Sequence, residues 1–130
     1  MQRIVSLVPS QTEFLAYLGL EQEVVGITKF CVHPLSWFRH KQRVGGTKKL
    51  HLDTIRNLNP DLIIANKEEN TKDEIELLQK EFTVYVSDIQ TIDDAFQMML
   101  DIGKLTQTYA RAEQCVREIQ AKRLLRKNEI

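Results

Sequence analysis

The segment that most constrains the fold is residues 43–70, in which a short apolar run lies between polar boundaries. The run, residues 61–65 (DLIIA), follows Pro60. Proline disfavours a helical residue before it, and a β-branched run of this length suits a strand buried on both faces of a parallel sheet. Upstream, residues 53–58 have the apolar spacing of a short helix. Because ligands meet such a sheet where its strands end, residues 66–70 are expected to form a loop that contacts a ligand.

The same alternation of strand and helix patterns extends over the rest of the chain. It predicts an α/β fold with a parallel sheet of about four strands sandwiched by helices. Ser10 with Glu13, and Thr71 with Glu74, have the spacing of capping boxes and predict that helices begin there. The expected strands are residues 4–8, 24–27, 61–65 and 84–86, and the loops that follow them, 8–13, 28–37, 66–70 and 87–91, should gather along one edge.

Composition excludes several classes of function. The chain has 130 residues, enough for one domain with a core, and its 18 basic and 18 acidic side chains leave no net charge that would favour nucleic acid or an anionic membrane. No apolar run reaches the length of a transmembrane helix. Strand-like residues follow Met1 almost directly, which leaves no room for a secretory signal. We therefore expect a cytoplasmic protein, or a periplasmic or cell-surface one if a signal has been removed.

The loop after the second expected strand has the densest reactive chemistry of the chain. Cys31 and His33, joined by Glu68 or Glu69, are candidate metal ligands, which would suit a metal-handling or metallocluster-assembly subunit. A closed zinc site needs about four ligands, so a buried thiol beside a hydrogen-bonded imidazole is the competing interpretation. Trp37 either stacks on a flat ligand or fills the edge of the core. No nucleophile–base pair is visible, so no enzymatic activity is expected.

The last segment has a narrow apolar stripe that can cover only one neighbour. Leu124 and Leu125 lie beyond it among basic residues and have no place in the core of a small domain. They indicate a surface for a partner, such as a second copy of the chain, or a continuation of the fold. The stripe residues, spaced four, three, four and three apart, are Leu105, Tyr109, Ala112, Val116 and Ile119.

Three blocks of sequence carry a resemblance to a known family: IVSLVPSQTEFLAYLGL at residues 4–20, VVGIT at 24–28, and RVGGTKKLHLDTIRNLNPDLIIA at 43–65. In these blocks the chain resembles the N-terminal lobe of the helical-backbone (class III) substrate-binding proteins of ABC importers. The resemblance implies an α/β ligand-binding lobe over residues 1–107, an interlobe backbone helix over 108–130, and no second lobe. It also implies no intrinsic cofactor, a corrinoid such as cobalamin, haem or a ferric siderophore as the ligand, and the importer's membrane subunits as partners.

The resemblance also assigns residues to roles by position. Bulky aromatic residues tend to occupy the places of His33, Thr47 and Asn66 in corrinoid binders, and this chain departs from that pattern. His33 offers either an axial nitrogen to cobalt or iron or a hydrogen bond to the periphery of a chelate. Acidic residues near the start of the helix after the fourth loop dock on the importer, a role that falls to Asp73 and Glu74. The ligand contacts implied are Pro9, Ser10, His33, Trp37, Thr47, Asn66 and Glu68.

Overall fold

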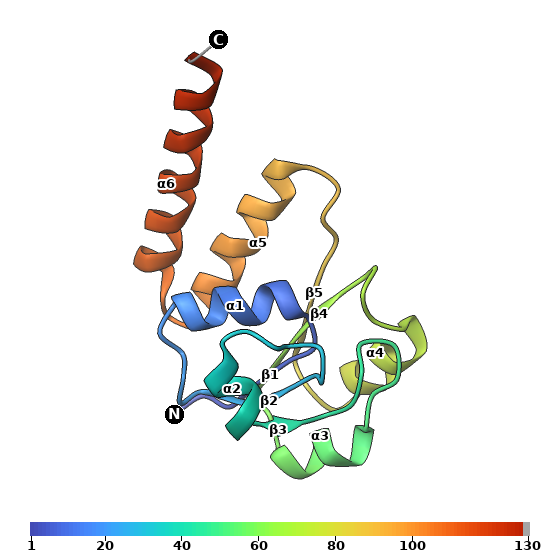
Figure 1. The fold of residues 1–130 in the computed structure, drawn as a ribbon. Helices are drawn as coiled ribbons and strands as arrows, with labels where there is room; N and C mark the ends of the chain where they lie inside the picture. Colours follow the sequence, from blue (N-terminus) through green and yellow to red (C-terminus); the bar gives the residue numbers. More distant parts are fainter. Residues whose placement is uncertain (129–130) are drawn as a thin grey trace. The chain divides into compact units, whose positions relative to one another are not determined.

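The computed structural model describes residues 1–128, and along them strands and helices alternate in the order expected from the sequence (Figure 1). The strands are short and, except for one, apolar, and the longest helix is the last. The elements in chain order are β1 (Ile4–Ser6), α1 (Pro9–Tyr17), β2 (Val24–Ile27), α2 (Leu35–His40), β3 (Gln42–Arg43), α3 (Leu52–Leu58), β4 (Leu62–Asn66), α4 (Lys72–Gln79), β5 (Val84–Ser87), α5 (Ile92–Leu105) and α6 (Tyr109–Asn128).

The strands form one parallel sheet in the order β3-β2-β1-β4-β5. Because every pairing is parallel, the carboxyl ends of the strands lie along one edge, which confirms the predicted architecture. The sheet has five strands rather than about four, because β3 consists of two exposed polar residues, Gln42 and Arg43, without an apolar pattern. The chain winds outward from β1 to β3 and then crosses back beyond β1 to β4. In sheets of this kind the loops at such a reversal border the ligand crevice.

The apolar core of the sheet-containing part lies on the face covered by α3 and α4, and α1 lies over the opposite face (Figure 1). Val5 of β1 and Ile63 of β4 belong to one buried cluster with Ile55 of α3 and Leu78 of α4. Successive side chains of a strand point to opposite faces, so Ser6 faces α1. Each fully buried Ile or Leu contributes roughly 1.5–3 kcal/mol, and a one-residue slip in pairing would turn the whole set to the opposite face of the sheet. These residues therefore fix the register of the strands that present the loops.

The chain falls into two compact units, Met1–Asp88 with the sheet and Ile89–Ile130 with α5 and α6. The expected division into residues 1–107 and 108–130 lies between α5 and α6, inside the second unit, and stays a prediction. No helix of the described chain, residues 1–128, combines the length and the apolar character needed to cross a bilayer.

The two helices of the second unit pack closely. A Cβ added at Gly103 of α5 would lie 2.6 Å from the Cβ of Ala112 in α6, so the absence of a side chain at Gly103 allows this approach. α5 begins with a capping box in which the Thr91 hydroxyl accepts the N–H of Asp94 and the Asp94 carboxylate accepts the N–H of Thr91. Ala112 and Val116 of the predicted stripe are buried, whereas Leu124 and Leu125 are exposed.

The expected capping box of Ser10 and Glu13 is wrong. α1 begins at Pro9, with Val8 as its N-cap residue and no side-chain cap. Proline suits the first position of a helix, because its φ is already helical and its missing N–H would have no partner there. Ser10 consequently lies inside the first turn, where it is exposed at the carboxyl edge of the sheet.

Candidate functional site

Asn70 joins three of the loops at the carboxyl edge of the sheet. Its Nδ2 donates to the carbonyl oxygen of Leu7, after β1, at 3.2 Å and to that of Thr47, after β3, at 3.0 Å. Its Oδ1 accepts the backbone N–H of Asn66, the last residue of β4, at 2.9 Å. The residue is only 3% exposed. One buried amide therefore fixes the spacing of loops on both sides of the winding reversal.

Asn66 has a structural role of the same kind. Its Nδ2 donates to the carbonyl oxygen of Ser87 at 3.2 Å and to the Ser87 hydroxyl at 3.0 Å, which ties β4 to the end of β5. Its Oδ1 accepts the N–H groups of Glu68 at 2.9 Å and Glu69 at 3.0 Å, which shapes the turn after β4. A direct contact between Asn66 and a ligand stays a prediction, and these four bonds argue against it because both ends of the buried amide are already paired.

The loop after β3 forms a short hairpin-like turn that depends on a glycine. Gly45 has φ +102°, and a Cβ there would lie 2.7 Å from the carbonyl oxygen of Lys49. The turn is closed by a bond of 2.9 Å from the N–H of Gly46 to the same carbonyl. It is tied to the loop after β2 by a bond of 2.8 Å from the N–H of Lys29 to the carbonyl oxygen of Gly45. The glycine pair therefore makes a tight turn.

The start of α4 holds this turn in place, so the expected capping box of Thr71 and Glu74 is wrong. Thr71 is the N-cap residue but its side chain caps no helical N–H. Its Oγ1 donates instead to the carbonyl oxygen of Lys48 at 3.0 Å, and Glu74 Oε2 accepts the N–H of Leu50 at 3.0 Å. Lys48 Nζ also donates to the carbonyl oxygen of Glu68. The turns after β3 and β4 are therefore connected at several points.

A cavity of about 480 Å³ lies beside this turn. It is lined by Lys29 and Phe30 after β2, by residues 45–49 of the turn, and by His51. Phe30 is 53% exposed, and the Lys29 ammonium lies 5.2 Å from the centre of its ring. Among the described residues that line the cavity, three are lysines and none is acidic. The site can therefore receive an acidic group beside an exposed aromatic surface.

His33 and Trp37, the candidates from the loop after β2, differ in their accessibility. His33 is exposed. Trp37 is 4% exposed, and the Lys41 ammonium lies 4.6 Å from the centre of its ring, so it fills the edge of the core and leaves little surface for a ligand. Burial lowers the pKa of Lys41 from its ordinary value, an effect that the charges of Glu21 and Glu23 partly offset. Of the two, His33 is the one positioned to contact a molecule in solution.

Cys31 is a buried thiol held among hydroxyl groups. It is 1% exposed, and its Sγ lies 3.1 Å from Thr12 Oγ1 and 3.2 Å from Thr28 Oγ1. Within residues 1–128 no three His, Cys, Asp or Glu side chains lie together in a way that could hold a metal ion. The proposed pair of Cys31 and His33 as ligands remains untested, but nothing in the surroundings of the thiol favours it.

The other predicted residues stay predictions, with different degrees of access. Ser10 and Glu68 are exposed at the carboxyl edge, and Pro9 is half-buried. Of the two acidic residues expected to dock on an importer, Asp73 is exposed, whereas Glu74 is half-buried and bonded to the turn after β3.

Sequence reasoning missed several residues of the cavity. The residues not singled out are Lys29, Phe30, Lys49 and His51. The available signal was the glycine pair at 45–46, because a tight turn beside an exposed aromatic and several lysines brings backbone and charge together.

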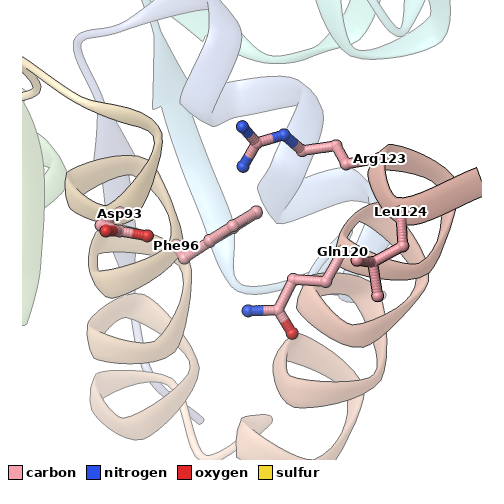
Figure 2. Close-up of a pocket in the computed structure, with 5 residues that line it drawn as sticks. All are labelled: Asp93, Phe96, Gln120, Arg123 and Leu124. Atoms are coloured by element: carbon pink, nitrogen blue, oxygen red, sulfur yellow. The ribbon is translucent and has the colours of Figure 1, made fainter. Parts of the chain in front are cut away.

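The second unit has a smaller hollow of about 310 Å³ between its helices. Figure 2 shows Phe96 extending from α5, and Gln120 and Arg123 extending from α6, toward the space between them. Leu124 also lines the hollow and is 62% exposed. The association of two copies through this helix stays a prediction.

Comparison with known proteins identifies the family. The sequence pattern of a family described as "Periplasmic binding protein" matches residues 4–128. The chain belongs to this family. It is 33% identical over 94 residues to a vitamin B12-binding protein of Vibrio cholerae, a match that covers 72% of this chain and 34% of that protein. It is 29% identical over 124 residues to an uncharacterized ABC transporter substrate-binding lipoprotein of Bacillus subtilis, covering 92% of this chain and 39% of that protein.

Solved structures of periplasmic binding proteins have the same fold. The periplasmic vitamin B12-binding protein of Vibrio cholerae superimposes with a TM-score of 0.81 at 26% identity, over 92% of this chain and 47% of that chain. A periplasmic haem-binding protein of Pseudomonas aeruginosa superimposes with a TM-score of 0.87 at 23% identity, over 98% of this chain and 46% of that chain. The chain thus spans about a third of the length of the first curated relatives and about half of these structures.

The comparisons correct the expected location. The prediction of a cytoplasmic protein is wrong, because the similar proteins are described as periplasmic or as a lipoprotein. That prediction rested on the strand-like residues that follow Met1, and the first strand of the fold does begin at Ile4. The start of a folded domain carries no information about the compartment in which the domain works.

Proposed function

We propose that this chain is the N-terminal lobe of a substrate-binding protein that receives a metal chelate in the periplasm or at the cell surface and delivers it to an ABC importer. The names of the relatives support this, since they include vitamin B12-binding proteins and an ABC transporter substrate-binding lipoprotein. The chelate is a corrinoid, haem or a ferric siderophore. The lobe contributes binding and not catalysis, since a preformed cleft needs only shape and a few placed polar groups.

The observation that carries the proposal is the rim of loops fixed by Asn70. A ligand loop that is already ordered loses little conformational entropy when the ligand binds. Asn70 and Thr71 secure the turn after β3 against the start of α4, and the cavity opens beside that turn. His33 is exposed at the same edge, where it supplies a nitrogen to the metal or a hydrogen bond to the chelate.

The remaining parts of the proposal follow from the family. α6 is the beginning of the helix that connects the two lobes, and Asp73, exposed in the first turn of α4, pairs with basic residues of the importer. With one lobe, only part of the chelate is covered, so we expect a Kd on the order of 10–100 μM rather than the tight binding of a closed two-lobed cleft.

The test is a titration of the chain with hemin, cyanocobalamin and a ferric siderophore, followed by quenching of Trp37, the single tryptophan of the chain. We expect saturable binding of at least one chelate and its loss in Gly45→Ala, which forces a Cβ against the Lys49 carbonyl. Gly19→Ala is the matched control, because Gly19 also has a positive φ, of +80°, but has open space around the added Cβ. Flat titrations with all three chelates, or equal binding by both variants, would refute the proposal.

A further inference from the structure

The cavity beside the turn after β3 has backbone donors as well as positive side chains. The carbonyl oxygen of Thr47 is bound by Asn70, and that of Lys48 by Thr71. In a trans peptide the N–H points opposite to the carbonyl of the same peptide unit. The N–H groups of Lys48 and Lys49 therefore point away from Asn70 and Thr71, and within the described residues neither of these N–H groups has an acceptor. Successive N–H groups arranged in this way form an anion-binding concavity.

The lysines add charge on the same side. Lys48 itself is committed, because its ammonium donates to the carbonyl oxygen of Glu68. Within residues 1–128 neither Lys29 nor Lys49 has such a bond, and both line the cavity. A Cβ added at Gly46 would lie in ordinary van der Waals contact, at 3.4 Å, with both the Cε of Lys29 and the ring of Phe30. The Lys29 side chain and the Phe30 ring therefore both lie against the turn.

We propose that this cavity binds a carboxylate group at the periphery of the chelate, so that the ligand is an anionic chelate with a flat or aromatic surface. The inference rests on the proposed function for the identity of the ligand and narrows its class. Charge-assisted bonds from N–H groups and ammonium groups to a carboxylate are about twice as strong as neutral ones. Phe30 supplies an adjacent face on which a planar group can lie. A chelate without free carboxylates leaves these donors without an acceptor.

The first experiment tests the anion site without any chelate. The full chain, labelled with ¹⁵N, is titrated with sodium citrate and, separately, with sodium chloride at matched ionic strength. We expect saturable shifts of the Lys48 and Lys49 amide signals with citrate alone, and a several-fold weaker response in Lys29→Gln and in Lys49→Gln. Lys80→Gln is the control, since Lys80 is exposed at the end of α4, away from the strands' carboxyl edge. Unmoved amide signals, or equal shifts in all variants, would overturn the proposal.

The second experiment compares hemin with hemin dimethyl ester, which differ only in whether the two propionates are free acids. We expect the acid to bind at least about tenfold more tightly, since charge-assisted bonds are lost in the ester. The ratio of the two affinities, acid to ester, should fall toward one in Lys49→Gln and stay unchanged in Lys80→Gln. Equal binding of acid and ester would overturn the anion site and leave the proposed function intact.

A third pair separates the two sources of carboxylate. Ferric citrate carries free carboxylates, whereas ferrichrome is a neutral hydroxamate chelate. Preference for ferric citrate, with no binding of either haem compound, assigns the site to a carboxylate siderophore. Absence of binding by every chelate, together with saturable citrate shifts at Lys48 and Lys49, would refute the proposed function and leave the anion site standing. Preference for ferrichrome and for the haem ester would overturn the carboxylate site.

Discussion

Replacing Asn70 with alanine tests the idea that one buried amide sets the geometry of the binding edge. The change removes two donated bonds, to the carbonyl oxygens of Leu7 at 3.2 Å and Thr47 at 3.0 Å, and one accepted bond, from the N–H of Asn66 at 2.9 Å. These three bonds connect the segments after β1, β3 and β4. The Asn66 N–H is left without its partner in a region where Asn66 and Asn70 are both buried.

The magnitude follows from those bonds. A neutral hydrogen bond contributes about 1 kcal/mol net, and a buried group left unpaired costs about 1–3 kcal/mol. Three bonds lost at one site therefore lower the free energy of unfolding by about 3 kcal/mol, a large fraction of the roughly 5–15 kcal/mol of a typical domain. The carbonyl oxygen of Thr47 has a second way to be satisfied, because Thr47 is only half-buried and water can reach it, which keeps the loss below the upper bound.

Urea unfolding followed by far-ultraviolet circular dichroism measures this loss. Asn57→Ala is the control, because Asn57 is an exposed asparagine on α3, and we expect a change within about 0.5 kcal/mol for it. Asn70→Asp separates the two kinds of bond, since it keeps an acceptor for Asn66 but cannot donate to Leu7 or Thr47 while ionised. A loss for Asn70→Ala no larger than that of Asn57→Ala would show that the edge is held together in another way.

Three further measurements test other contacts. Burial lowers the pKa of Lys41 from 10.5, so unfolding becomes less favourable as pH rises from the folded pKa toward 10.5. Because the Lys41 ammonium lies over the ring of Trp37, the fluorescence of Trp37 should titrate with a midpoint below 10.5. The Lys41→Met variant should lack that step. Cys31, at 1% exposure, should react with Ellman's reagent only on unfolding, whereas fast labelling of both thiols in the folded chain would contradict its burial. Gly103→Ala should cost about 1–3 kcal/mol in urea unfolding because its Cβ meets Ala112 at 2.6 Å, and Ala112→Gly in the same chain should recover part of that loss.

The strands were predictable wherever burial requires an apolar pattern in the sequence. Residues 61–65 form a continuous apolar run, and the structure has β4 at Leu62–Asn66, buried throughout. β3 has no apolar pattern, because Gln42 and Arg43 are exposed and belong to the sheet only through pairing with β2. An apolar pattern in the sequence indicates burial, and an edge strand of two exposed residues is not buried and so has no such pattern.

The site was less predictable than the fold, because its bonds join residues that are distant in sequence. The polar loop after β4 was correctly expected at the carboxyl edge. A contact between Asn66 and a ligand stays a prediction, but the bonds that Asn66 makes within the protein were not foreseen. Its Nδ2 donates to Ser87, 21 residues away in the sequence, and that pairing exists only because β5 lies beside β4. The same holds for Asn70, whose side-chain amide donates to the carbonyl oxygen of Leu7, 63 residues earlier in the chain. No local pattern predicts which asparagine will be buried between loops that are distant in sequence.

The use of Thr71 has a consequence for which residues can replace it in related sequences. At an ordinary helix start the side chain accepts a backbone N–H, so serine, threonine, aspartate and asparagine interchange. Here the hydroxyl of Thr71 donates a hydrogen bond to the carbonyl oxygen of Lys48. An ionised aspartate cannot donate, so its carboxylate oxygen would face that carbonyl oxygen without a hydrogen between them. We therefore expect serine to replace Thr71 without loss of this bond. Aspartate, which is otherwise among the residues preferred at the start of a helix, should not be tolerated here.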